Sequence, residues 1–462
     1  MRRCGFARHL VLCLACVGLI LLNQAMVYSA GNDNYRQFHK YTDESLQIKS
    51  HENNIYQWVR NFNDPLLDTV VMEVLKNNYD INKAIARLTK AQGVVAKARA
   101  GLKPLLSLRA GALYLADVAS NDFDKFVNST SVDFHWDIDI WKEGQFELDS
   151  QKARLIASEA DSSFIKNYIV AQTVRSWILA IETKLQLELA ARLLEDYRNI
   201  LKIVQSKYEQ GFAHKQDIST AKAKLAQAEE AYFQLQGAHI EALRSIELLL
   251  GRNPEGSIAI SQDLPELPYL PANLSVNDII ANRDDVLTAK YRLDAESLNL
   301  ERTKRGGYPN LKLTSSLIKS SPELNTLTNS DKAFTASGIS VDLPIIDGGK
   351  SKANVLISAA EKDEASIEYQ RKNKGAFSEV ETALMNGRII EARKKYLEVA
   401  FQENTQIEKL ARKQYDLGEV DMLTVFYHTL QTGETKARLL HLRAAELMQR
   451  ADLYYSLGQK NR

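Results

Sequence analysis

The stretch Ser129–Trp141, STSVDFHWDIDIW, decides the fold. From Val132 to Ile140 every second residue is apolar, and the residues between them are aspartates and one histidine. Side chains of a β-strand point alternately to opposite faces, so this pattern predicts a strand with one wet face and one apolar face. The predicted wet face holds Asp133, His135, Asp137 and Asp139, and the apolar face holds Phe134, Trp136 and Ile138.

Similar alternation predicts four strands, at about residues 104–116, 130–141, 309–318 and 334–346. In the last of them Ile339, Val341 and Leu343 fall on the apolar face and Asp342 on the polar one. Alternating segments of about ten residues, with aromatic residues near their ends, are typical of membrane β-barrels. We therefore expect the apolar face to meet lipid and the polar face to line a lumen.

A metal or acid–base site is the alternative reading of the polar face, and it would make the protein an enzyme using Asp133, His135 and Asp137. Alternate strand residues stand about 6.6–6.8 Å apart, and this makes convergence on one ion at about 2.0–2.2 Å difficult. No nucleophile elbow, phosphate loop or zinc-binding helix motif occurs elsewhere in the chain. We expect no catalytic residue, no metal and no cofactor, and elemental analysis tests the metal alternative.

The chain repeats itself at an offset of about 205 residues. Lys103-Pro-Leu-Leu106 matches Tyr308-Pro-Asn-Leu311, and Tyr208-Glu-Gln-Gly211 matches Tyr415-Asp-Leu-Gly418. The predicted repeats span residues 58–250 and 275–458, each with a helix, two strands, a long helix, a tip loop and a returning helix. A linker at 251–274, which contains four prolines, separates them.

Each repeat contains one very long predicted helix. Residues 145–207 have no proline or glycine, and residues 350–414 have only Gly375 and Gly387 as weak points. A helix of about 60 residues is roughly 90–95 Å long. Apolar residues recur at spacings of three and four, so these helices are expected to pack side by side as a coiled coil with a solvated outer face.

The first 30 residues are predicted to be a signal peptide, followed by an N-terminal tail at 31–57. Three arginines precede an apolar run at residues 10–22, which is too short to span a membrane. All three cysteines lie in this segment, so the expected mature chain has none. Removing those three arginines from a formal net charge of +1 leaves about −2, which argues against a nucleic-acid partner.

Four strands cannot close a barrel, because small closed barrels need about eight. An open sheet edge in lipid leaves backbone groups unsatisfied at several kcal/mol each. Several chains must therefore pool their strands, and their helices would continue the wall of the resulting tube.

Across residues 55–458 the chain resembles the TolC-like outer-membrane efflux family. The resemblance rests on Trp58-Val-Arg-Asn-Phe-Asn-Asp-Pro65, on Leu343-Pro-Ile-Ile-Asp-Gly-Gly349 and on the two Tyr-x-x-Gly loops. It implies a mostly helical fold with a 12-stranded transmembrane barrel closed by a homotrimer. It also implies a bacterial outer-membrane location reaching into the periplasm, a periplasmic adaptor and an inner-membrane pump as partners, and passive export of drugs or other small molecules.

The resemblance further implies that the two tip loops form the site where the adaptor docks and the channel is gated. The residues that correspond to this site are Tyr208, Gly211, Phe212, Asp217, Tyr415, Gly418, Glu419, Asp421, Thr424 and Tyr427. The chain departs from the family pattern at Thr424 and Tyr427, where acidic residues often line the pore, and at Val420, where some members carry an arginine. Two alternatives stay open: an outer-membrane duct of type I protein secretion, and a periplasmic coiled-coil adaptor or structural rod.

Overall fold

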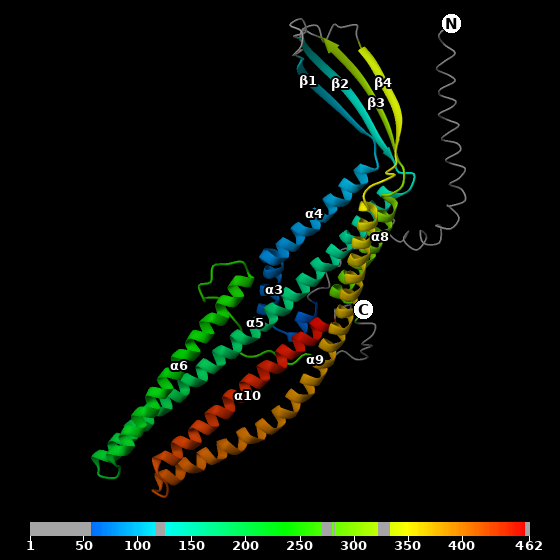
Figure 1. Cartoon of the computed structure of the whole chain (residues 1–462). Coiled ribbons are helices and arrows are strands. Elements are labelled where there is room, and N and C mark those ends of the chain that lie inside the picture. The colour runs from blue at the N-terminus through cyan, green and yellow to red at the C-terminus, as the bar shows by residue number, and fades with distance from the viewer. Residues whose placement is uncertain (1–56, 116–124, 270–279, 281, 322–332, 458–462) are drawn as a thin grey trace, which may run out of the picture. The chain divides into compact units, whose positions relative to one another are not determined.

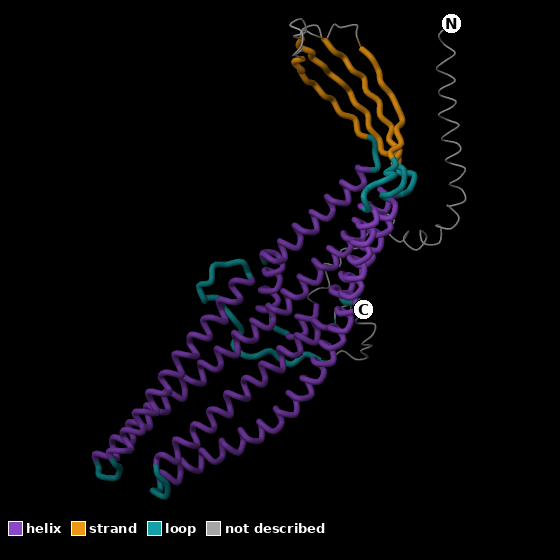
Figure 2. The backbone as a smooth tube through the Cα atoms, in the orientation of Figure 1, coloured by secondary structure: helices purple, strands orange, loops and turns teal. Residues whose placement is uncertain are grey.

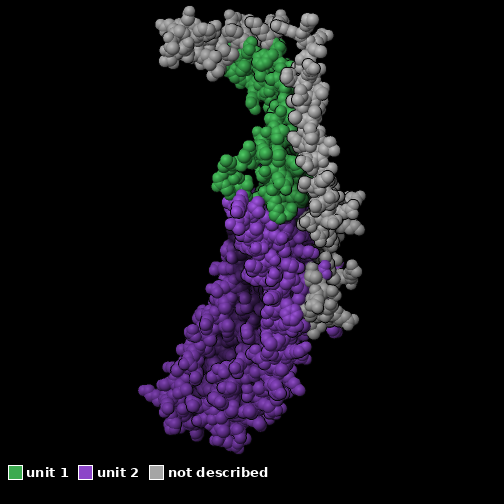
Figure 3. All heavy atoms as spheres, turned by 45° about the vertical axis from the view of Figure 1, so that its right-hand side comes forward, with its two compact units in different colours: residues 1–51, 98–153, 301–351 green, residues 52–97, 154–300, 352–462 purple. Residues whose placement is uncertain are grey.

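The computed structural model describes residues 57–115, 125–269, 280, 282–321 and 333–457 (Figure 1). The predicted signal peptide and nearly all of the predicted N-terminal tail lie outside these residues. The described residues form two compact units (Figure 3). Unit 1 lies within residues 98–153 and 301–351, and unit 2 within residues 52–97, 154–300 and 352–462.

Unit 1 contains one antiparallel sheet with the strand order β1-β2-β3-β4 (Figure 2). The strands are β1 (Leu105–Leu115), β2 (Lys125–Ile138), β3 (Asn310–Ser321) and β4 (Ala333–Asp342). β2 pairs with β3 from Asn128 opposite Ser321 to Ile138 opposite Leu311. The central pair of the sheet thus joins the two halves of the sequence.

The register of the sheet separates an apolar face from a polar face. Trp136, Leu313 and Ile339 lie in one cross-strand row, and Ile138, Leu311 and Val341 lie in another. On the opposite face Asp133 lies across from Ser316, and Asp137 lies across from Lys312 and Ser340. The alternation in the sequence therefore becomes two chemically different surfaces of one sheet.

Two residues that the sequence placed on strand faces lie beyond the ends of the strands. β2 ends at Ile138 and β4 ends at Asp342, so Asp139 and Leu343 follow their strands. The carboxylate of Asp139 accepts hydrogen bonds from the backbone N–H groups of Gly144 and Gln145, at 3.1 and 2.8 Å. The first N–H groups of a helix have no intrahelical partner, so Asp139 satisfies donors at the start of α5.

The helices are α3 (Pro65–Asn77), α4 (Tyr79–Gly101), α5 (Glu143–Glu209), α6 (Lys215–Leu249), α8 (Asp284–Arg305), α9 (Lys350–Asp416) and α10 (Met422–Ser456), preceded by the 3₁₀ helix η3 (Gln57–Phe62). α5 and α9 have 67 residues each, which corresponds to roughly 100 Å. None of the described helices has an apolar stretch long enough to cross a membrane.

A buried carboxylate ties three parts of unit 2 together. Asp64 caps α3 by accepting from the N–H groups of Leu66 and Leu67, at 3.1 and 3.3 Å. Its second oxygen accepts from the indole N–H of Trp177 on α5 at 2.8 Å, and the Ser261 hydroxyl of the linker also donates to it. Trp177 and its neighbours on α5 are fully buried, so this network lies in the main hydrophobic core.

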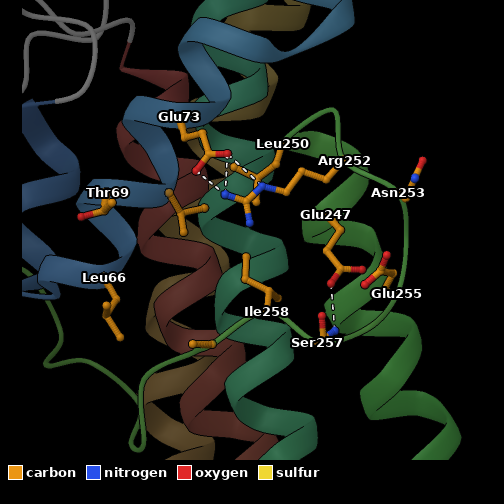
Figure 4. Close-up of a pocket in the computed structure, with 12 residues that line it drawn as sticks. Leu66, Thr69, Glu73, Glu247, Leu250, Arg252, Asn253, Glu255, Ser257 and Ile258 are labelled. Carbon is orange, nitrogen blue, oxygen red and sulfur yellow. Dashed lines mark hydrogen bonds and ion pairs between the residues drawn. The ribbon is translucent and has the colours of Figure 1, made fainter.

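The linker after α6 is held by charged groups (Figure 4). Arg252 donates to both carboxylate oxygens of Glu73 on α3, at 2.6 and 2.8 Å. Glu247 accepts from the backbone N–H groups of Gly256 and Ser257, at 2.6 and 2.8 Å. Burial opposes the charge of Glu247, but these backbone donors outweigh it and hold the pKa of Glu247 below its ordinary value.

Candidate functional site

The loop between α5 and α6 is a glycine-terminated helix end. Gly211 has φ of +81°, a left-handed conformation in which glycine avoids the Cβ clash. Its N–H donates to the carbonyl of Tyr208 at 3.0 Å, and the N–H of Phe212 donates to the carbonyl of Lys207 at 2.8 Å. These two main-chain bonds form a Schellman cap that closes α5 and turns the chain back toward α6.

The loop between α9 and α10 repeats this turn. Gly418 has φ of +78°, and its N–H donates to the carbonyl of Tyr415 at 3.0 Å. The N–H of Glu419 donates to the carbonyl of Gln414 at 2.9 Å. The shared Tyr-x-x-Gly sequence therefore corresponds to the same backbone turn in both halves.

The two returning helices start differently. At α6 the Asp217 carboxylate accepts from the backbone N–H of His214 at 2.7 Å. At α10 Asp421 is the N-cap residue, and its carboxylate accepts from both the N–H and the hydroxyl of Thr424, at 2.9 and 2.7 Å. The Thr424 hydroxyl and N–H hold the pKa of Asp421 below its ordinary value.

Side chains close to the two tips contact each other within the chain. The ammonium group of Lys207 on α5 lies 3.5 Å from the ring centroid of Tyr415 on α9, a cation–π contact. Behind it Tyr197 stacks on Phe426 with centroids 5.5 Å apart, in a small core that joins α5, α6, α9 and α10. The sequence offered no signal for Lys207, because its partner lies in the other half of the chain.

The outer surface of the tips is rich in exposed apolar side chains. Phe212 is 78% exposed and Tyr427 is 59% exposed, and Tyr208 is also exposed. Glu419 is exposed in the turn, whereas the Thr424 hydroxyl is already bonded to Asp421. The structure thus places the ten residues of the predicted tip site at the ends of two helical hairpins, with large apolar groups uncovered.

The polar face of the sheet is held by short-range hydrogen bonds. Asp133 accepts from the hydroxyls of Ser131 and Ser316, at 2.9 and 2.7 Å. The His135 ring lies 3.3 Å from the carboxylate of Asp137, and the Lys312 ammonium lies 3.0 Å from Asp342. Among the described residues no group of three histidine, cysteine, aspartate or glutamate side chains could hold a metal ion.

The apolar face of the sheet is largely uncovered. Ile339 is 63% exposed and Val341 is 52% exposed, and Leu106 and Leu108 of β1 are exposed as well. Phe134, Trp136 and Ile138 are partly exposed, and the indole N–H of Trp136 donates to the carbonyl of Leu102 at 3.2 Å.

The described chain thus combines two helices of 67 residues, duplicated halves and a sheet with one apolar face. The profile of the family described as outer membrane efflux protein matches residues 70–252 and 275–459. This chain belongs to that family, which is one of efflux proteins and not of enzymes.

Individual relatives are distant but cover nearly the whole chain. The cation efflux system protein CusC of Escherichia coli K12 is 24% identical over 409 residues, which cover 87% of this chain and 88% of CusC. The pyoverdine export outer membrane protein OpmQ of Pseudomonas aeruginosa PAO1 is 24% identical over 429 residues, 89% of this chain and 88% of OpmQ. The structure of the outer-membrane channel OprN has a TM-score of 0.80 at 22% identity and covers 87% of this chain and 92% of that one.

Proposed function

We propose that three copies of this chain form a passive exit channel of a tripartite efflux system in the bacterial outer membrane. The observation that carries the proposal is the four-stranded sheet, whose strands β1 and β4 have no further partner among the described residues. Three such sheets would give 12 strands, enough for a closed barrel without free edges. In this barrel Phe134, Trp136, Ile138, Ile339 and Val341 face lipid, and Asp133, His135, Asp137 and Asp342 face water.

A stripe of apolar residues on α9 supports assembly of identical copies. We call it the α9 stripe: Ile367, Met385, Ile389, Val399, Ile407 and Leu410, all exposed in the single chain. At roughly 100° per residue these positions fall on one side of the helix. A helix of a neighbouring copy is the partner that covers this stripe and continues the wall of a helical tunnel in the periplasm.

The tips are the proposed docking and gating site. Their exposed aromatic residues suit a helical hairpin of a periplasmic adaptor, and this adaptor connects the channel to an inner-membrane pump. The Lys207–Tyr415 contact holds the two hairpins of one chain together. Opening of the channel at the tips therefore requires this contact and the stacked pair behind it to separate.

The cargo is a small solute chosen mainly by the pump. Relatives of similar identity are named for cation efflux and for pyoverdine export, so the shared fold serves different molecules. In this proposal residues 1–30 direct export of the chain and are then removed.

Conductance of the purified protein in planar lipid bilayers tests the proposal. We expect discrete channels and a trimer in detergent by native mass spectrometry. A stable soluble monomer without detergent, or no conductance even when tip-loop variants are used, would contradict it.

A further inference from the structure

Away from the tips, α9 and α10 enclose a hollow of about 590 Å³ whose charged side chains are all basic. We call it the arginine groove, and its main lining residues are Arg393, Tyr396 and Leu397 from α9 and Arg438, His441 and Leu442 from α10. Arg393, Tyr396, Arg438 and His441 are exposed, and Leu442 is buried beneath them. The groove thus has an apolar floor and a cationic rim.

The two arginines of the groove are unpaired. Within the part of the chain that the structure describes, neither Arg393 nor Arg438 has an ion pair or a hydrogen bond. Their neighbours differ, because Lys394 pairs with Glu446 at 2.8 Å and Arg443 pairs with Glu398 at 3.8 Å.

Two carboxylates lie near the groove without neutralising the arginines. Glu182 of α5 is hydrogen-bonded to His441 at 2.8 Å. Glu434 stands one turn before Arg438 on α10 and is exposed, with no ion pair to it in the described structure. The groove therefore presents two guanidinium groups whose hydrogen-bond donors are available.

The groove lies on the side of α10 that faces away from the linker. Leu440, Arg443 and Leu447 line one hollow together with Leu264, Pro265 and Leu267 of the linker. Arg450 donates to the carbonyl of Pro268, and the Tyr454 hydroxyl donates to the carbonyl of Tyr269. These contacts recur every three or four residues and so mark one face of the helix. Arg438 stands two positions from Leu440, about 200° around the helix, and so points away from that face.

The inference rests on the proposed channel, in which the packing of α10 determines the direction that the groove faces. α10 packs against α5 on one side, through His441 and Glu182, and against α9 on the other, through Glu446 and Lys394. Its remaining two faces look outward and inward in a tubular wall. The proline-containing linker needs surface and solvent, so the linker face is the outer one and the arginine groove faces the tunnel.

We propose that the arginine groove binds an organic anion, a carboxylate, phosphate or sulfonate attached to an apolar body, as it passes through the tunnel. Guanidinium groups donate bidentate hydrogen bonds to such oxyanions. Tyr396, Leu397 and Leu442 provide the apolar surface for the body of the molecule. The volume is within the range of about 300–1,000 Å³ that is usual for small-molecule sites.

Block of single channels by 1-naphthalenesulfonate tests the groove in the full-length protein. We expect the sulfonate to reduce the conductance of the wild type, and the cation 1-naphthylmethylammonium to do so less. R393Q/R438Q should weaken the sulfonate block at least about tenfold, because two charge-assisted contacts are lost. The matched control K395Q/K436Q removes the same charge two residues away on each helix, facing away from the groove, and should keep the wild-type block.

The possible outcomes distinguish failure of anion binding in the groove from failure of the proposed channel function. Absence of conductance in the wild type would count against the proposed function itself. Normal conductance with equal sulfonate block in R393Q/R438Q and in the wild type would overturn the groove alone. Loss of the trimer in R393Q/R438Q but not in the control would show that the arginines pair with carboxylates of a second copy, which also overturns anion binding. R393K/R438K keeps the charge without the planar fork and should give an intermediate block.

Discussion

The helices α5 and α9 occupy equivalent places in the two halves and have equal lengths, yet they bury very different surfaces. α5 contributes Val170, Trp177, Ile178 and Ile181 to the core, each with 0% exposure. On α9 the largest apolar side chain that is buried is Val380, and the α9 stripe is exposed. Equivalent helices of a duplicated sequence therefore differ in burial: α5 completes the core of the chain, whereas the α9 stripe is left uncovered in the single chain.

The largest effect is expected at Trp177 on α5. Trp177→Ala removes a fully buried ring and the hydrogen bond to Asp64, which should cost about 3–5 kcal/mol of unfolding free energy. Thermal unfolding in detergent, followed by circular dichroism, measures it. Met385→Ala on α9 is the control and should leave the fold of the single chain intact; equal loss in both variants would mean that the two helices do not differ in this way.

Val341 tests the uncovered face of the sheet. Val341→Arg places a charge on the apolar face and should destabilise the assembled barrel by about 2–4 kcal/mol per chain if the residue lies near the bilayer midplane. The neighbouring change Ser340→Arg points to the other face and should be tolerated. The amount of protein recovered from outer membranes reports both, and equal yields would argue for a rod without lipid contact.

Ile389 tests the α9 stripe. Ile389→Glu should weaken the trimer by about 1.5–3 kcal/mol per interface, because the side chain loses apolar burial against the neighbouring copy. Lys395→Glu, also on α9 but outside the stripe, is the matched control. Native mass spectrometry gives the trimer fraction, and a trimer that survives Ile389→Glu would place the contact between copies elsewhere.

Substitution of the glycines in the tip turns tests whether positive φ contributes equally to stability at the two hairpins. Gly211→Ala and Gly418→Ala should each lower the free energy of unfolding by about 1–2 kcal/mol, because both residues have positive φ. No heavy atom lies within 4 Å of an added Cβ, so the backbone conformation is the only source of this cost. Gly387→Ala within α9 should instead stabilise by about 0.5–1 kcal/mol. The unfolding midpoints of the three variants measure these changes. Unequal losses of stability at the two tips would show that the surroundings strain or support one of the turns.

The smallest effect is a pH dependence at the second tip. Because its folded pKa is lowered below the ordinary 3.8, Asp421 contributes stability that is fully present above about 3.8 and is lost as the pH falls through the folded value. Asp421→Asn keeps an N-cap acceptor without this titration. The difference in unfolding temperature between the two proteins should shrink as the pH falls below about 4; a difference that is constant with pH would remove the carboxylate from this role.

Much of the fold could be predicted from the sequence because its signals are local. The alternation from Val132 to Ile138 and the absence of proline from the two long helices specify strands and helices by themselves. The predicted ends of β2 and β4 were wrong by a few residues. At β2 the reason is that Asp139 accepts from backbone N–H groups at the start of α5, and this capping role has no periodicity to reveal it.

Contacts between residues far apart in the chain could not be predicted. Lys207 with Tyr415 and Trp177 with Asp64 join residues more than one hundred positions apart. The unequal burial of α5 and α9 is also a tertiary property, since both sequences are amphipathic and only the packing decides which side is covered. The residues proposed for docking, for the lumen and for lipid contact stay predictions.

The turns at both tips are closed by main-chain hydrogen bonds, so their geometry depends on little more than one glycine each. Evolution can therefore replace the side chains at Tyr208, Phe212 or Tyr427 without unfolding the hairpins. In the proposed role of the tips as a docking surface, binding specificity could thus change one substitution at a time while the scaffold stays the same.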